Sequence, residues 1–123
     1  TALHSAVAAG RSDVAQRLLT AGASVNAATS EGETVLMGSV RNGNRRLTLA
    51  LVNAGAKLEA KNKDGETALH VAIEVGHEKI ALDLISAGAD VAVRTAAGDN
   101  AMALADRRGR AFVLVRLREL ASR

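Results

Sequence analysis

Apolar residues recur along this chain in short helical patterns, two in each stretch of 33 residues. Between residues 67 and 89, Leu69, Ala72 and Ile73 fall at i, i+3 and i+4, and Ile80 and Leu84 continue the apolar face after a Gly-His break at 76–77. Each pattern covers only two to three turns, which is too short for a helix that is stable alone in water. We therefore expect these helices to be held by packing against similar units elsewhere in the chain.

The same pattern returns in register every 33 residues, without insertion or deletion. Equivalent positions hold related residues: Thr1, Thr34, Thr67 and Asn100; Leu3, Leu36, Leu69 and Met102; Gly10, Gly43, Gly76 and Gly109. A fixed period of this length indicates stacked units, none of which can bury its apolar face alone. The sequence thus predicts one domain over residues 1–123, with repeats at 1–33, 34–66, 67–99 and 100–123.

Two segments carry a family resemblance. T-A-L-H-S-A from Thr1 and T-A-L-H-V-A from Thr67 resemble the ankyrin signature T-P-L-H-x-A, and D-G-E-T from Asp64 and A-G-A-D from Ala87 are similar to the rest of that repeat. The resemblance is weaker in repeats two and four. It implies an all-α solenoid of helix-turn-helix pairs joined by β-hairpin-like fingers, with eight helices in four antiparallel pairs. Alanine stands in place of the signature proline, which should leave the topology unchanged.

The two ends of the array differ in character. Asp106 and Arg118 replace apolar residues at positions that face the next repeat, so we expect repeat four to be a C-terminal cap. Repeat one shows no such replacement. We expect Leu3 and Val14 to form an exposed apolar strip, and the chain to be truncated at its N-terminus.

Composition narrows the classes of function. The chain has no cysteine, and this excludes disulfides and cysteine metal sites. It has a single aromatic residue, Phe112. No apolar run is long enough for a membrane span and no signal peptide is visible, so a soluble, cytoplasmic protein is the default expectation. The net charge of +3 conceals an arginine cluster in the last repeat: Arg107, Arg108, Arg110, Arg116, Arg118 and Arg123.

Candidate catalytic and metal-binding groups do not form a recognisable site. His77-Glu78 lacks the second histidine of an H-E-x-x-H motif, because Ala81 occupies that position. The resemblance gives His4 and His70 a structural role, as hydrogen-bonding partners of the signature threonine and of the neighbouring finger. Serines lack a G-x-S-x-G setting, and the glycine-rich turns lack the lysine of a phosphate loop. We expect no enzyme activity, no cofactor, no metal and no small-molecule substrate.

The resemblance places partner contacts on the fingers and on the exposed end of the first helix of each pair. The finger positions are Ala28, Ser30, Glu31 and Glu33; Lys61, Lys63, Asp64 and Glu66; Arg94, Ala96, Ala97 and Asp99. The helix positions are Ala8 and Ala9; Arg41 and Asn42; Glu74 and Val75; Arg107 and Arg108. The surface becomes basic toward Arg94, Arg107 and Arg108. We therefore expect a partner protein with an acidic segment, bound most strongly at that corner by three arginines free to grip carboxylates.

Two alternatives remain open. The chain is also consistent with a regulatory or anchoring module of a longer multidomain protein. Nucleic-acid binding through the C-terminal arginines is the weaker alternative, because repeat three is net acidic and the chain lacks aromatic residues for base stacking.

Overall fold

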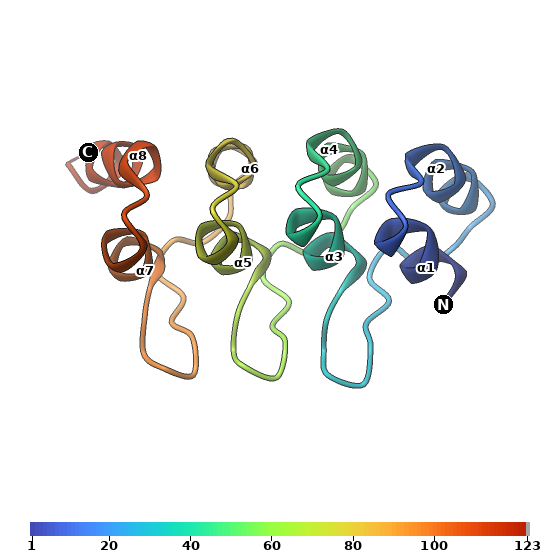
Figure 1. The fold of residues 1–123 in the computed structure, drawn as a ribbon, viewed down its shortest axis with the longest axis horizontal. Coiled ribbons are helices and arrows are strands. Elements are labelled where there is room, and N and C mark those ends of the chain that lie inside the picture. Colours follow the sequence, from blue (N-terminus) through green and yellow to red (C-terminus); the bar gives the residue numbers. More distant parts are fainter. Residues whose placement is uncertain (123) are drawn as a thin grey trace.

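The computed structural model describes residues 1–122 and confirms the predicted all-α solenoid. Two helices follow each other in every repeat and are stacked as a pair (Figure 1). The bounds are α1 (Ala2–Ala8), α2 (Ser12–Thr20), α3 (Val35–Arg41), α4 (Arg45–Asn53), α5 (Ala68–Val75), α6 (Glu78–Ser86), α7 (Ala101–Arg108) and α8 (Ala111–Ala121).

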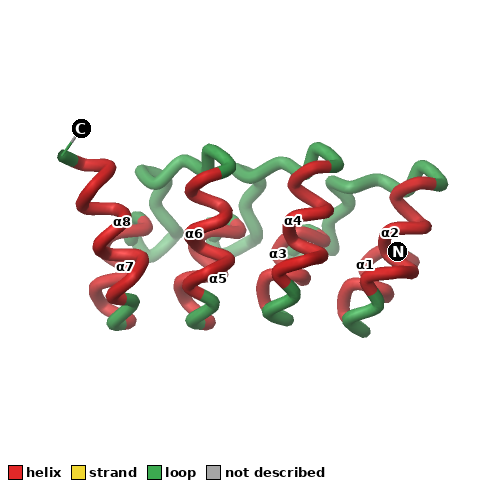
Figure 2. Tube along the Cα trace, turned by 90° about the horizontal axis from the view of Figure 1, so that it is seen from above, coloured by secondary structure: helices red, strands yellow, loops and turns green. Residues whose placement is uncertain are grey.

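The helices form two rows. We call α1, α3, α5 and α7 the inner helices and α2, α4, α6 and α8 the outer helices; the loops at 25–33, 58–66 and 91–99, here called fingers, project from the inner row (Figure 1). All the extensive contacts between helices join members of one pair or of adjacent pairs. Seen from above, the pairs lie side by side along the long axis (Figure 2). The fold is therefore built from neighbour contacts, as the period predicts.

Side chains at the repeat boundaries set where the helices begin. The Thr34 hydroxyl accepts a hydrogen bond from the Met37 amide, with an Oγ1–N distance of 3.2 Å, and so caps the start of α3. Asn44 and Asn100 cap α4 and α7 in the same way, at 3.1 and 2.9 Å. At the other end, Gly76 closes α5 in the left-handed conformation. Threonine or asparagine at the start and glycine at the end thus recur with the repeat.

The fingers are held by hydrogen bonds within and between them. In the second finger, the Asn62 side-chain oxygen accepts from the amides of Asp64 and Glu66, each at 3.0 Å. Neighbouring fingers are joined where the Lys63 amide donates to the Glu31 carbonyl at 2.8 Å and where the Ala96 amide donates to the Asp64 carbonyl at 2.9 Å. Over residues 1–122 the only β-type pairing is an isolated bridge in the first finger. The fingers are consequently linked loops, with their spacing fixed by main-chain contacts.

Gly65 is required at its turn for two reasons. Its φ of +72° lies in the left-handed region, and a Cβ there would lie 2.7 Å from the Ala96 amide nitrogen. The glycine therefore allows the third finger to approach the second closely.

The core lies between the two rows of helices. Leucines at equivalent positions are fully buried in the interior repeats, as Leu36 and Leu69 are on the inner side and Leu51 and Leu84 on the outer side. The many small alanines between them let the helices approach closely. Burial of these recurring apolar positions is the main stabilising term.

The expectation of an exposed strip at the first repeat is wrong for Leu3, which is only 2% exposed. Its equivalent in the last repeat, Met102, is partly exposed, because no repeat follows there within the described residues. This position therefore faces the following repeat, and the second repeat covers Leu3. The open face of the first pair instead presents Ala2 and Ser5, which are small, and half-buried Val14. The residues on this face are less apolar than we expected from the sequence.

Asp106 and Arg118 are both exposed, whereas Ile73 and Ile85, their equivalents in repeat three, are buried. Charged side chains at these positions remain solvated because no helix packs over them within the described residues.

Candidate functional site

A groove runs between the fingers and the inner helices, and it contains most of the partner-binding residues predicted from the sequence. A cavity of about 360 Å³ lies between the second and third fingers and α7. A second, of about 260 Å³, lies between the first two fingers and α3. Thirteen of the predicted residues line these cavities or the adjoining one beneath the first finger: Ala8, Glu31, Glu33, Arg41, Asn42, Lys63, Asp64, Glu66, Glu74, Ala96, Ala97, Asp99 and Arg107.

Ion pairs between a finger and the helix that follows it line this groove. The Arg41 Nε lies 2.5 Å from Glu33 Oε2, and Arg107 forms an ion pair with Asp99. Both pairs join equivalent positions eight residues apart, one at the end of a finger and one near the end of the next inner helix. Each pair thus links a finger to the inner helix that follows it.

The equivalent positions beside α5, 66 and 74, both hold glutamate, and the neighbouring inner helices supply the cations. Glu66 lies 3.7 Å from Arg41 of α3 and accepts a hydrogen bond from Asn62 at 3.0 Å. Glu74 lies 2.6 Å from Arg108 of α7. The like charges beside α5 are therefore compensated by ion pairs to the helices on either side.

These contacts affect the titration of Arg41. Its hydrogen bond to Glu33 raises the pKa of the Arg41 guanidinium above its ordinary value, with smaller Coulombic contributions from Glu33 and Glu66. The guanidinium remains charged at any pH at which the protein is folded. Arg41 thus acts as a permanent cation between the first two fingers.

The three arginines of the basic corner do not form free guanidiniums, contrary to our expectation. Arg107 is paired with Asp99, Arg108 with Glu74, and Arg94 donates to the Gly98 carbonyl at 2.9 Å. The physical reason is that each arginine lies next to a carboxylate or carbonyl of its own or the preceding repeat. The corner consequently consists of two half-exposed ion pairs and one arginine, Arg94, that donates to a neutral carbonyl.

The remaining predicted residues have distinct positions. Lys63 pairs with Glu31 at 3.2 Å across the first two finger tips, and Lys61 is exposed on the second finger. The Asn42 amide donates to the Val7 carbonyl at 2.7 Å and so caps the C-terminus of α1. Val75 is an exposed apolar residue at the end of α5. Asn42 therefore connects repeats, while the other three present side chains to solvent.

The histidines make the kind of hydrogen bonds that the resemblance implies. His70 lies 3.0 Å from the Thr67 hydroxyl and 2.9 Å from the Val93 carbonyl. His4 lies 2.8 Å from the Thr1 hydroxyl and 3.3 Å from the Glu33 carbonyl. Burial lowers the pKa of His70 below its ordinary value, so that the neutral imidazole is favoured. Within residues 1–122, no three His, Asp or Glu side chains are arranged to bind a metal ion.

The C-terminal arginines are distributed over different surfaces. Arg107 and Arg108 lie in the groove, whereas Arg116 pairs with Glu119 on α8 at 3.3 Å. Arg110 donates to the Ile73 and Glu74 carbonyls at 2.7 and 3.0 Å, which caps α5. Arg118 is exposed on α8, and Arg123 lies outside the described residues. The arginines that cluster in the last repeat of the sequence are thus spread over different surfaces, and those described do not form one continuous patch that could bind a phosphate backbone.

Two features of the site were missed in the sequence. One is the set of ion pairs between positions eight residues apart, which opposite charges at 33 and 41 and at 99 and 107 could have indicated. The other is a cavity between outer helices, lined by residues that were assigned no role.

Comparison with known proteins agrees with this architecture. The family model described as ankyrin repeats (3 copies) matches residues 3–95. A search of curated proteins found no match. None of the helices within residues 1–122 has the length and apolar character needed to cross a membrane.

Proposed function

The chain belongs to the ankyrin-repeat family, and on this premise we propose that it binds a partner protein in the groove between its fingers and inner helices. Ankyrin repeats are commonly protein–protein interaction modules. The proposal concerns where this chain binds and what it recognises.

The observation that carries the proposal is the concentration of charged, solvent-accessible side chains along this groove. Six cations and six anions lie on the fingers and on the last turns of the inner helices that adjoin them: Arg41, Lys61, Lys63, Arg94, Arg107 and Arg108; Glu31, Glu33, Asp64, Glu66, Glu74 and Asp99. Solenoids use such extended concave surfaces for binding. Because positive and negative charges are balanced in this groove, we expect it to recognise a partner whose charged side chains are arranged to match its own, and not simply a partner of opposite net charge.

The ion pairs leave the arginines available to a partner. Arg107 and Arg108 remain about half exposed, and each guanidinium has five N–H donors, only some of which contact its own carboxylate. Exposed ion pairs contribute only about 0–1 kcal/mol, so a partner carboxylate can join or replace Asp99 or Glu74 at small cost. We therefore keep the corner of Arg94, Arg107 and Arg108 as the proposed contact for an acidic segment.

The test begins with a partner captured by the full chain and identified, with its affinity measured by calorimetry. Arg94→Glu combined with Arg107→Gln should weaken binding at least tenfold, about 1.4 kcal/mol. Glutamine is chosen at position 107 because a glutamate there would repel Asp99. Arg116→Gln on the outer row is the matched control and should leave the affinity unchanged.

Two results would count against the proposal. If Glu31→Gln and Glu66→Gln abolish binding while the arginine variants bind normally, the contact lies at the acidic finger tips. If neither set changes the affinity, the groove is not the binding surface.

A further inference from the structure

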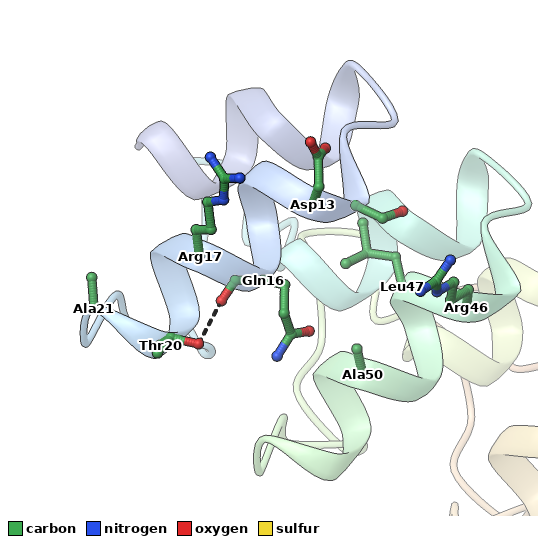
Figure 3. Close-up of a pocket in the computed structure, with 9 residues that line it drawn as sticks. Asp13, Gln16, Arg17, Thr20, Ala21, Arg46, Leu47 and Ala50 are labelled. Carbon is green, nitrogen blue, oxygen red and sulfur yellow. Dashed lines mark hydrogen bonds between the residues drawn. The ribbon is translucent and has the colours of Figure 1, made fainter.

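A cavity lies outside the groove, between the outer helices α2 and α4. It measures about 530 Å³, a size found for ligand-binding pockets. Leu47 and Ala50 of α4 form one wall, and Gln16 and Thr20 of α2 form the other (Figure 3). Arg17 and Arg46 lie at its edges. The lining thus combines the apolar side chains of Ala21, Leu47 and Ala50 with polar and charged ones, among which the two arginines outnumber the one carboxylate, Asp13.

Two small residues create this cavity. Between α4 and α6, Arg45 and Asp83 form a bidentate ion pair, with distances of 2.6 and 3.0 Å, that fills the equivalent space. One repeat earlier the corresponding residues are Ser12 and Ala50, and both line the cavity. Ser12 accepts a hydrogen bond from Asn44 at the start of α4, at 2.9 Å, but no ion pair joins positions 12 and 50. The cavity is therefore a specific feature of the first two repeats.

Cations without a carboxylate partner outnumber free carboxylates on the outer helices. On the outer helices, Asp83 is paired with Arg45 and Glu119 with Arg116, while Glu78 accepts from two amides at the start of α8. Within residues 1–122, four cations on these helices have no carboxylate partner, against a single free carboxylate, Asp13; the cations are Arg17, Arg46, Lys79 and Arg118. The outer surface thus has an excess of positive charge that the groove lacks.

Apolar side chains continue along the outer row from the cavity. Leu49, next to Ala50, is 37% exposed, and Val115, at the equivalent position of α8, is 54% exposed. Leu82 lies between them in sequence register and is half-buried. Phe112, one turn before Val115, is 73% exposed and is the only aromatic residue in the chain. Such a row, beginning at a cavity and flanked by cations, is typical of an interaction surface.

We propose that the outer helices bind an acidic amphipathic helix of a partner protein. One apolar side chain of that helix enters the cavity between α2 and α4, others contact Leu49 and Val115, and its carboxylates meet Arg17, Arg46 and Lys79. Neighbouring helices pack about 8–10 Å apart, so the row from α2 to α8 extends over roughly 25–30 Å. A helix of about 16–20 residues has this length.

The charge pattern favours a protein helix over other polyanions. A helix can place a few carboxylates opposite the cations and keep an apolar face toward Leu49 and Val115. A nucleic-acid backbone or an anionic lipid surface presents negative charge throughout, including opposite Asp13, and offers the cavity no side chain. This surface is separate from the groove, so the inference does not depend on the proposed function.

The probe for the test is a fluorescein-labelled helical peptide of about 18 residues, with leucine and phenylalanine along one face and glutamate on both flanks. Fluorescence anisotropy with the full chain measures its affinity. The same peptide with lysine in place of glutamate should bind at least about tenfold more weakly. Equal binding of the two peptides, or no binding of the glutamate peptide, overturns the proposal.

Rebuilding the ion pair tests the cavity directly. The double variant Ser12→Arg, Ala50→Asp copies the Arg45–Asp83 arrangement and should close the cavity, which we expect to weaken peptide binding at least about tenfold. Unchanged affinity in this variant would contradict the proposal. If the variant does not fold, Arg46→Gln with Leu49→Ser replaces it, because both side chains are exposed and should leave folding intact.

Two controls distinguish the surface and the occupant. Arg41→Gln in the groove should leave peptide affinity unchanged, and a loss there would show that the peptide binds the groove instead. Vesicles containing phosphatidylserine and a single-stranded DNA oligonucleotide are the competing probes. Tighter binding of either than of the glutamate peptide overturns the assignment to a protein helix.

Discussion

The His70 imidazole Nε2 donates a hydrogen bond to the Val93 carbonyl, 2.9 Å away, and so connects the start of α5 to the third finger. The Thr67 amide donates to the other ring nitrogen, Nδ1, at 3.1 Å, which leaves the proton on Nε2. With 1% of its surface exposed, His70 is held as a neutral residue inside the solenoid. The placement of the third finger against α5 therefore depends in part on a titratable group.

The first prediction follows from this histidine. Burial lowers the pKa of His70 in the folded state below 6.5, the value it takes when the chain is unfolded. The unfolded chain therefore binds more protons, so the His70 contribution to stability is complete above about pH 6.5 and declines as the pH falls toward the folded-state pKa. Urea unfolding at a series of pH values should show this decline. His70→Gln should be less stable than the unmodified chain at neutral pH but should lose less stability on acidification. An identical loss in both proteins would show that His70 does not cause the decline.

The second prediction concerns the contact between fingers. Gly65→Ala places a Cβ 2.7 Å from the Ala96 amide nitrogen, in addition to the strain of a positive φ. Gly98 also has a positive φ, but a Cβ there meets nothing within 4 Å, which makes Gly98→Ala a matched control. We expect Gly98→Ala to cost about 1–2 kcal/mol from backbone strain alone and Gly65→Ala to cost more. Equal free energies of unfolding for the two variants would show that the close approach of the third finger to Gly65 does not affect stability.

The third prediction compares a core residue with a residue on the open face of the last pair. Leu84→Ala should destabilise the protein by about 2–5 kcal/mol, because Leu84 is fully buried and its loss leaves a cavity. Arg118→Leu should be neutral or slightly stabilising, since this side chain is exposed, although added apolar surface favours self-association. Chemical unfolding and sedimentation measure the two effects. A cost for Arg118→Leu as large as that for Leu84→Ala would mean that Arg118 has an essential contact.

The repeat period is sufficient to predict most of the fold. Residues one period apart occupy corresponding places in the solenoid, so the positions of Thr67, His70 and Gly76 within the repeat indicate where α5 begins and ends. Leu3 shows where the reasoning was incomplete. Apolar character alone does not say which of two neighbours a side chain faces, and comparison with partly exposed Met102 was needed to place it.

The places of the candidate side chains in the fold were predictable, but their interactions were not. The register correctly brings Arg94, Arg107 and Asp99 to one corner, yet it could not show that Arg107 is paired with Asp99. Pairing depends on side-chain reach between a finger and a helix, which a one-dimensional pattern does not contain. The cavity beside Ala50 depends in the same way on which residues fill the space between two helices.

The most direct test of the proposed function is hydrogen exchange of the full chain with and without its captured partner. The account predicts slower exchange in the partner complex at the second and third fingers, residues 58–66 and 91–99, with the largest change near Arg94. Residues 12–20 of α2 are compared with the fingers as the alternative surface, because they lie on the outer row. Protection at the fingers with little change in α2 would support groove binding; protection confined to the outer helices, with fingers exchanging as in the free protein, would contradict it.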